Sequence, residues 1–412
     1  MQPLPGFRDF LPAACAERNY IFRTWREVAR RYGFVEYDGP LLEELDLYKK
    51  KSGEEIVRQL YDFVDKGNRP VALRPEMTPT LARMVAANHR TFRKPLKWFS
   101  IPQVFRYERP QRGRLREHYQ LNCDIVGEKE LNADAELIAL AIDVVRAFGL
   151  GPNDFVVRIS DREFWTELLR VEKVPAEQWE GILQAIDKSE REPRDKIRER
   201  LGSVAEPIFE IMEKGGDSAK LNHVVENLRL RGLGDFVEVD VRIVRGLAYY
   251  TGVVFEIFDR AGKFRAIAGG GRYDQLIAQQ SGGAVALPAL GFAIGDVVIG
   301  DIIRDHASAR AQMEKAVSAE CCLDIYVVIA KEERRSSALS VIQELRDRGY
   351  RVEYPFEAAK VPKQFQTAEQ LGARLAILFG DEWPNIVVKN LATGQQRLVA
   401  GQELIAQLAV DR

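Results

Sequence analysis

The stretch that decides the fold is residues 96–126, LKWFSIPQVFRYERPQRGRLREHYQLNCDIV. Its first nine residues and its last eight have the patterning of strands. Between them lie five arginines within eleven residues: Arg106, Arg109, Arg112, Arg114 and Arg116. Arginine gives planar, always-charged, bidentate recognition of phosphate. We therefore expect a strand, an arginine-rich loop and a second strand that together bind a phosphate-bearing ligand.

A run of charge is more often a solvated loop than a binding site, but two features favour a binding site here. The run contains no lysine between Phe99 and Glu128, and two strands frame it. The net charge of the whole chain is −1, so the concentration of positive charge is local. Near-neutral charge speaks against a general polyanion binder, but it is compatible with a nucleic acid held by a local patch.

Length and composition are those of an ordinary soluble protein. The chain has 412 residues, of which 46% are hydrophobic and 29% charged, so we expect two or three domains. No apolar run approaches the roughly 20 residues of a membrane span, and the N-terminus has no signal-peptide pattern. The four cysteines and four histidines show no metal-ligand spacing,. We expect a reduced, cytoplasmic protein without membrane contact.

Hydrophobic patterning predicts an α+β chain in two parts. Strands and helices follow one another irregularly over residues 1–320, with a hairpin at 62–74 and a helix at 78–88. The segment at about 161–234 is highly charged with helical periodicity, and we interpret it as an inserted helical module. Residues 321–412 alternate strand and helix regularly, as an independent α/β module does.

The segment LRPEMT at 73–78 carries two polar side chains at a strand-to-helix junction. Glu76 and Thr78 either cap the helix or bind a substrate ammonium group, and the residues alone leave both interpretations open.

A third polar segment is VRGLAYYTG at 244–252. Paired tyrosines often serve packing. Here Arg245 lies five residues before Tyr250, beside a glycine that permits close approach of a ligand. The glycines at 269–271 match no nucleotide-binding fingerprint.

Taken together and in order, these segments resemble those of class II aminoacyl-tRNA synthetases, specifically the histidyl-tRNA synthetase family, over essentially the whole chain. Residues 33–40 look like motif 1, whose proline, here Pro40, lies at the dimer interface in this class. Residues 104–116 look like motif 2. Residues 245–252 resemble the family's histidine-binding signature, and 268–273 resemble the glycine-rich segment that follows it. The last 90 or so residues are similar to the anticodon-binding domain of the class.

The resemblance implies an architecture and an activity. Residues 1–320 would form the antiparallel-sheet catalytic domain with its helical insertion, and residues 321–412 the anticodon-binding domain. The enzyme would activate L-histidine with ATP, accompanied by Mg²⁺, and transfer it from the adenylate to tRNA(His). It would act as a homodimer. This chemistry needs no protein nucleophile, only positioning and stabilisation of charge on phosphorus.

The resemblance also implies roles for single residues. The α-phosphate of ATP would meet Arg106 and Arg245, the distal phosphates Arg114, and the adenine amino group Glu108. The histidine would be bound by Glu76, Thr78, Gln120, Asp124, Tyr249 and Tyr250, with Asp124 and Tyr250 at the imidazole nitrogens. The acceptor end of the tRNA would meet Arg109, Arg112 and Arg116.

Three residues depart from the pattern of the family. Ala248 stands where many members have an acidic residue, and Asp124 replaces glutamate, a change that other members share. Val298 stands where motif 3 normally has the arginine that holds the γ-phosphate. Arg114 or magnesium ions are candidates to bind the γ-phosphate in its place.

Two other functions compete with the ligase. The synthetase-like regulatory subunit of ATP phosphoribosyltransferase shares the catalytic core, and Val298 mildly favours it. The signature at 245–252 and the C-terminal module oppose it. A non-catalytic sensor of tRNA or histidine is the second rival, and the full set of polar site residues opposes that interpretation.

Overall fold

The computed structural model describes residues 1–49, 57–109, 111, 113–216, 218–245 and 249–410. The chain divides into two compact units, Met1–Met313 and Glu314–Arg412. Helix α13 (Ala307–Cys321) contains the division. The boundary expected at residues 320–321 falls at the end of this helix, and the domain limits stay a prediction.

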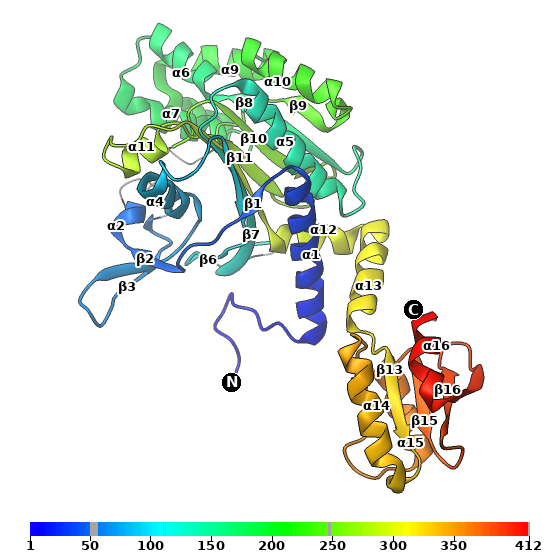
Figure 1. Ribbon diagram of the computed structural model, residues 1–412. Coiled ribbons are helices and arrows are strands. Elements are labelled where there is room, and N and C mark those ends of the chain that lie inside the picture. The colour runs from blue at the N-terminus through cyan, green and yellow to red at the C-terminus, as the bar shows by residue number, and fades with distance from the viewer. Residues whose placement is uncertain (50–56, 110, 112, 217, 246–248, 411–412) are drawn as a thin grey trace. The chain divides into compact units, whose positions relative to one another are not determined.

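Within the described residues, a nine-stranded sheet forms the frame of the first unit (Figure 1). Its order is β1-β5-β7-β12-β11-β10-β8-β9, and β6 pairs with β7 beside this path. The pairs β1–β5 and β8–β9 are parallel and the others antiparallel, so the expected α+β class with a largely antiparallel sheet is confirmed. The strands are β1 (Val35–Glu36), β5 (Leu96–Ser100), β6 (Gln103–Phe105), β7 (Glu117–Val126), β8 (Phe155–Asp161), β9 (Val237–Val239), β10 (Val253–Asp259), β11 (Ala268–Arg272) and β12 (Ala289–Gly295).

Helices cover one face of this sheet. Helix α5 (Leu131–Arg146) packs against β7, β11 and β12 and is apolar on most of its sides. A helix of that kind must be buried all round, and α1 (Pro12–Arg31) and α10 (Ala219–Leu230) pack against it. Helix α12 (Asp296–Asp305) packs on β7 and α1. Part of the opposite face is covered by Leu81 and Val85, which share a hydrophobic cluster with Val126 and Val254. The polar residues of β7 lie on the rest of that face.

Strand β7 shows how the sequence separates the two faces. Successive side chains of a strand point to opposite sides of the sheet. Leu121, Cys123 and Ile125 are at most 3% exposed, as expected for a hydrophobic face packed on the helices. Asn122 and Asp124, which alternate with them, carry the polar groups of the other face.

The hairpin and the helix predicted at residues 62–88 are confirmed. Strands β3 (Tyr61–Val64) and β4 (Pro70–Leu73) are antiparallel, and β2 (Leu42–Glu44) extends them to a small sheet. Helix α4 (Thr78–Asn88) follows and packs on α11 (Leu276–Gln280). The short helix α2 (Asp46–Lys49) packs on α4 and β2.

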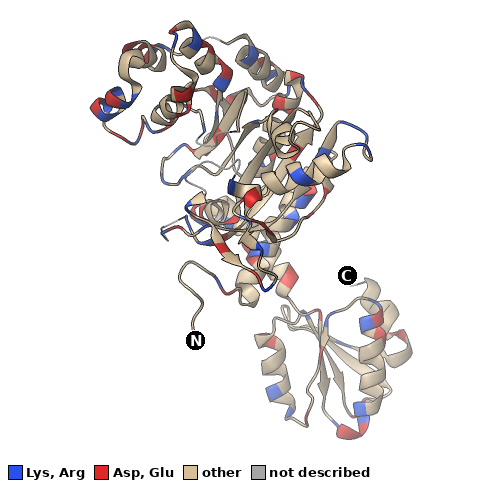
Figure 2. Ribbon diagram, turned by 90° about the vertical axis from the view of Figure 1, so that its left-hand side faces the viewer, with Lys and Arg blue, Asp and Glu red and all other residues tan. Residues whose placement is uncertain are grey.

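Helices fill the interval between β8 and β9, where the inserted module was expected. They are α6 (Arg162–Val171), α7 (Ala176–Asp187), α8 (Arg194–Leu201), α9 (Ala205–Lys214) and α10. Trp165, Ile186 and Ile208 belong to their shared core and are fully buried. Acidic and basic residues are mixed along the ribbon (Figure 2), in agreement with the net charge of −1.

The second unit is a five-stranded sheet, in its described residues, with helices around it. The order is β14-β13-β15-β16-β17, with β13 parallel to β14 and β15. Its core includes Val327, Ile377 and Phe379, none of which is exposed. The elements are β13 (Ile325–Ile329), α14 (Arg335–Asp347), β14 (Val352–Glu353), α15 (Val361–Gln370), β15 (Leu375–Phe379), β16 (Asn385–Asn390), β17 (Gln396–Ala400) and α16 (Leu404–Val410).

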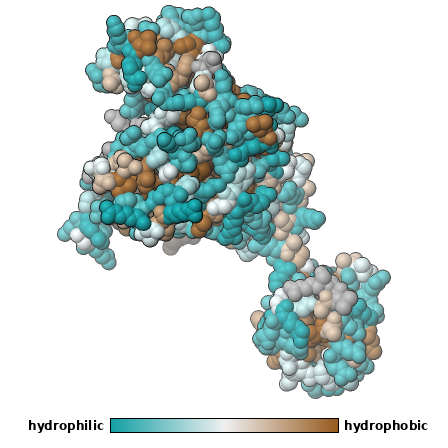
Figure 3. Space-filling model, turned by 45° about the horizontal axis from the view of Figure 1, so that its top comes forward, coloured by the Kyte–Doolittle hydropathy of each residue, from teal (hydrophilic) through white to brown (hydrophobic). Residues whose placement is uncertain are grey.

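Among the described residues, we find no helix that is both long enough and apolar enough to span a membrane. The face shown in Figure 3 is mostly hydrophilic, with hydrophobic residues in small groups.

Candidate active site

A pocket of about 680 Å³ opens on the polar face of the large sheet. Its size suits a small-molecule ligand. Residues far apart in the sequence line it, from the arginine-rich loop, β7, β11, β12 and the inserted module. It gathers ten of the residues predicted from the sequence: Glu76, Thr78, Arg106, Glu108, Arg114, Gln120, Asp124, Arg245, Tyr249 and Tyr250.

The floor of the pocket is set by the register of β7 and β12. Gln120 pairs with Gly295, Asn122 with Ala293, and Asp124 with Gly291. Each polar side chain therefore stands beside a residue with almost no side chain. A Cβ atom at Gly291 would overlap the carboxylate of Asp124. The pairing of polar with small residues leaves room above the sheet for a ligand.

The guanidinium of Arg245 lies in a space formed by residues of β10 and β11. Gly269 pairs across the strands with Glu256, and a Cβ atom at Gly269 would overlap the guanidinium of Arg245. That guanidinium donates to the Glu256 carboxylate and lies 5.8 Å from the ring centre of Tyr250. Burial alone would lower the pKa of Arg245, but its interactions with Glu256 and Tyr250 together outweigh burial and raise this pKa. Arg245 is thus a fixed cation aimed into the pocket.

Asp124 is a buried carboxyl group that holds its proton unusually well. It is 3% exposed, and its Oδ1 accepts a hydrogen bond from the hydroxyl of Tyr273. Burial raises the pKa of Asp124 to about 7, and the Tyr273 hydroxyl opposes that rise. At neutral pH this group both donates and accepts, which suits a ligand whose own nitrogens titrate in the same range.

Glu76 lies at the other side of the pocket and is 5% exposed. Its Oε2 accepts a hydrogen bond of 2.9 Å from the Tyr249 hydroxyl. The N-cap residue of α4 is Met77, which makes no side-chain capping bond. Glu76 and Thr78 both line the pocket, and their binding of an ammonium group stays a prediction.

The arginine-rich loop is a hairpin held by its own contacts. The backbone groups of Gln111 and Arg114 exchange two hydrogen bonds of 2.9 Å. Arg114 forms an ion pair with the buried carboxylate of Glu108. The Nε of Arg106 donates to the carbonyl of Pro75 at 3.0 Å, which joins the loop to the segment that carries Glu76.

The three arginines expected at a tRNA end differ in their surroundings. Arg109 is exposed, and Arg112 lies outside the described residues. Arg116 is half-buried, donates to the carbonyl of Glu108 at 3.0 Å and stacks 4.2 Å from the ring centre of Tyr107. Arg116 therefore stabilises the loop from within.

His118 also lines the pocket, although nothing in the sequence marked it. Burial, together with the positive charges of Arg106, Arg8 and Arg114, lowers the pKa of His118 to about 3. The ring is therefore neutral at physiological pH. Its Nε2 lies 3.1 Å from the Nε2 of Gln120.

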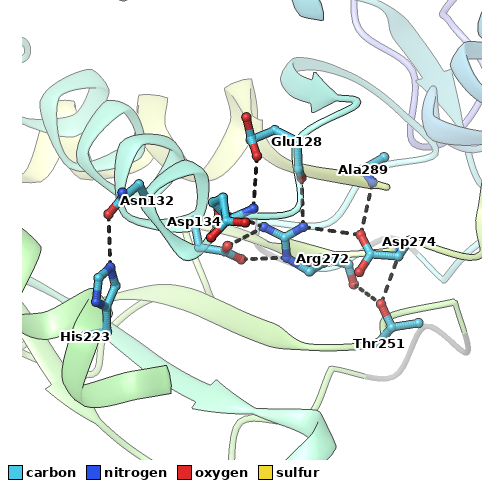
Figure 4. Close-up of polar contacts among 9 residues, drawn as sticks. Glu128, Asn132, Asp134, His223, Thr251, Arg272, Asp274 and Ala289 are labelled. Atoms are coloured by element: carbon cyan, nitrogen blue, oxygen red, sulfur yellow. Dashed lines mark hydrogen bonds and ion pairs between the residues drawn. The ribbon is translucent and has the colours of Figure 1, made fainter. Parts of the chain in front are cut away.

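A buried ion pair fixes the end of β11 at Arg272 (Figure 4). The guanidinium of Arg272 on β11 pairs with Asp134 of α5 and donates to the carbonyl of Glu128 at 2.9 Å. Asp274 accepts from the backbone of Ala289 at 3.1 Å. Removing one partner of such a pair costs about 3–5 kcal/mol. Tyr273, between Arg272 and Asp274, is thereby aimed at Asp124.

Several residues of the site escaped the sequence reasoning. Tyr273 and Glu256 contact predicted site residues, and Arg191 and Arg265 line the pocket. Only Tyr273 stands in a recognisable local pattern, because it lies two residues after the glycines at 269–271. The others come from segments that reach the pocket through strand register and packing.

The pKa of Asp124 makes the stability of the protein depend on pH. This carboxyl titrates at about 3.9 in an unfolded chain, whereas burial raises its pKa to about 7 in the folded protein. The folded state holds the proton more tightly, so the stabilisation is complete below about pH 4 and is lost as pH rises through 7. Asp124→Asn removes this dependence. Between pH 5 and 8, unfolding by urea should show the wild type losing on the order of 2 kcal/mol relative to the variant.

Asp62→Asn, at an exposed position on β3, is the matched control and should follow the wild type at every pH. Parallel curves for Asp124→Asn and the wild type would contradict a raised pKa at Asp124.

Comparison with known proteins agrees with this geometry. A family model described as histidyl-tRNA synthetase matches residues 6–296, and one described as anticodon binding domain matches residues 324–410. The histidine–tRNA ligase of Opitutus terrae is 44% identical over 414 residues, which cover 94% of this chain and 93% of that protein. The chloroplastic/mitochondrial histidine–tRNA ligase of Arabidopsis thaliana is 38% identical, covering 96% and 84%.

A solved structure shows the same fold. The crystal structure of histidyl-tRNA synthetase from Nostoc sp. is similar to the structure of this chain, with a TM-score of 0.77 and 23% identity, covering 100% of this chain and 99% of that one. The fold, the site and the two family models agree, and the chain belongs to the histidyl-tRNA synthetase family.

Proposed function

We propose that this chain is a histidine–tRNA ligase that forms histidyl-adenylate from L-histidine and ATP and then transfers the histidyl group to tRNA(His). The observation that carries the proposal is a single pocket with two buried carboxyl groups, Glu76 and Asp124, and two fixed cations, Arg106 and Arg245. The carboxyl groups suit an amino acid with a basic side chain, and the cations suit a phosphate beside it.

The histidine end of the pocket would bind both the ammonium group and the imidazole ring of the amino acid. Glu76, with Thr78 and Gln120, would bind the ammonium group, and Tyr249 orients Glu76 through its hydroxyl. Asp124 and Tyr250 would bind the imidazole nitrogens. Because a buried polar group left unpaired is costly, such a site rejects side chains that cannot pair, by a factor on the order of 10⁴ in favourable cases.

The nucleotide end would hold ATP for in-line attack by the histidine carboxylate. Arg106 and Arg245 would stabilise the charge that develops on the α-phosphate, and Arg114 would bind the distal phosphates. Glu108 would accept from the adenine amino group. Among the described residues no cluster of three metal-binding side chains exists. Mg²⁺ is bound mainly through substrate phosphates and water in such sites, and it would arrive with ATP and neutralise part of its charge.

The remaining partners follow from the same assignment. The C-terminal module would bind the anticodon, with domain limits near 1–320 and 321–412 and the insertion at about 161–234. The candidates near the acceptor end of the tRNA remain Arg109, Arg112 and Arg116. Of Arg109 and Arg116, whose placement the structure describes, Arg109 is the more accessible.

Pro40 would lie in a homodimer interface, which the exposed side chains of Leu41 and Leu42 support. All four cysteines are unbridged, which supports a cytoplasmic setting.

The alternative functions have less support. A regulatory subunit of ATP phosphoribosyltransferase normally lacks the C-terminal module, whereas residues 324–410 match an anticodon binding domain. A non-catalytic sensor has no need of Arg245 fixed by Glu256 at the reacting end of the pocket.

The first experiment is ATP–pyrophosphate exchange with the purified full-length protein. We expect exchange that depends on histidine and magnesium, because adenylate formation is reversible and needs no tRNA. No exchange at saturating histidine, ATP and magnesium would remove the ligase proposal and favour the regulatory subunit.

Gly269→Ala tests whether the position of the Arg245 guanidinium matters for the reaction. The new methyl group would displace the guanidinium end of Arg245 and leave the backbone of the sheet in place. The free energy of unfolding should therefore fall by less than the roughly 3–5 kcal/mol that loss of one partner of a buried pair costs. The kcat of exchange should fall by about 10- to 100-fold, because misplacement of a catalytic group by about 1 Å has an effect of that size. Gly181→Ala is the control, since no atom lies within 4 Å of its added Cβ. Equal kcat values for both variants would show that the position of Arg245 is unimportant.

A chain that ends at residue 321, after α13, tests the role of the C-terminal module. Histidine-dependent exchange should be retained because the pocket lies wholly in the first unit. Aminoacylation of tRNA(His) should become much weaker because the anticodon contacts are lost. Unchanged kcat/KM for the tRNA would refute the anticodon-binding assignment.

A further inference from the structure

Among the residues that the structure describes, five arginines line the pocket: Arg106, Arg114, Arg191, Arg245 and Arg265. Three of them face a carboxylate of the chain itself. Arg114 pairs with Glu108 and Arg245 pairs with Glu256, while the charge of Arg191 acts on Asp187. A cation paired in this way keeps its orientation, but part of its charge is already neutralised before a ligand arrives.

Arg265 differs from these three. It lies in the connection between β10 and β11, and its Nη2 donates to the neutral amide oxygen of Gln111 at 3.0 Å. Within the described part of the chain, no carboxylate lies within ion-pair distance of Arg265. Its charge is therefore fully available to an anion in the pocket.

The position of Arg265 is the outer end of the pocket. Gln111 lies at the tip of the arginine-rich loop, where its backbone closes the turn with Arg114. Arg265 is exposed, whereas Glu76 and Asp124 are buried at the inner end. A ligand with its amino acid portion between those carboxyl groups and a chain of phosphates leading outward would end beside Arg265.

The neighbouring wall offers no cation of its own. Val297 and Val298 of α12 line the pocket, and Val298 lies 3.6 Å from the position of a Cβ atom at Gly113. This apolar wall faces the loop that carries Gln111 and Arg114. A strongly anionic group here depends on the charges that reach it from the loops.

We propose that Arg265 binds the distal phosphates of ATP and the pyrophosphate that leaves, with Gln111 holding its guanidinium against the arginine-rich loop. This role deepens the proposed ligase function and rests on it. The cation that α12 lacks at Val298 is supplied by a different segment, the β10–β11 connection.

The test compares ATP with AMP, which lacks the distal phosphates. Equilibrium binding to the full-length protein is measured by calorimetry at one magnesium concentration. Arg265→Gln should weaken ATP binding by about 10- to 100-fold, the usual effect of losing a hydrogen bond to a charged group. Binding of AMP should change less than about twofold. Equal losses for ATP and AMP would overturn the proposal.

Two further variants separate charge from loop structure. Gln111→Ala removes the amide that holds Arg265 but keeps its charge, so it should affect ATP binding much less than Arg265→Gln does. Equal effects would reduce Arg265 to a structural link between loops. Addition of Val298→Arg to Arg265→Gln should regain part of the lost affinity for ATP, and no regain would place the distal phosphates elsewhere.

The outcome is distinguishable from failure of the ligase proposal. A wild type without histidine-dependent exchange refutes the ligase function. A wild type with exchange, and an Arg265→Gln variant with unchanged ATP affinity but weaker tRNA charging, refutes only this inference and assigns Arg265 to the tRNA backbone.

Discussion

The site depends on the register between β7 and β12. This pairing places Asp124 beside Gly291 and Asn122 beside Ala293, so that polar groups and empty space alternate on one face of the sheet. A slip of one residue would turn Asp124 toward the helices and bring Cys123 to the ligand. The apolar residues that alternate with Asp124 pack on the helix side of the sheet, and their burial therefore also fixes the chemistry of the opposite face.

On the neighbouring strands β10 and β11, a glycine again lies across from a charged residue. Gly269 on β11 lies across from Glu256 on β10, and the space above the glycine holds Arg245. A buried ion pair costs desolvation free energy that hydrophobic packing of the same volume would not. Arg245 also has a backbone φ of +59°, an unfavourable region for a residue with a side chain,. Both costs are consistent with a cation placed for catalysis rather than for stability.

Sequence reasoning reached the residues that stand in dense local patterns. The arginine-rich loop and the paired tyrosines belong to such patterns, whereas Asp124 was predicted only through the family resemblance. The pocket brings them together. It missed Glu256 and Arg265 because each is a single charged residue in an ordinary strand or loop. Their importance arises from a cross-strand neighbour or from the tip of another loop. Such contacts depend on register and packing, which no local pattern encodes.

The distribution of charge around the pocket has a consequence for turnover. A ligase of this kind must bind ATP and then release pyrophosphate, so cations that bound the distal phosphates too strongly would slow release. Arg114 already shares its charge with Glu108, and the wall at Val298 adds none. Arg265 is exposed and bonded to a neutral amide, so a phosphate bound there, as proposed, would be open to solvent and to competing ions,. Arg245, by contrast, is enclosed and fixed by Glu256, and in the proposed mechanism it would meet the phosphate at which charge develops. Strong, rigid charge at the reacting atom and weaker, accessible charge at the leaving group favour the transition state over the bound product.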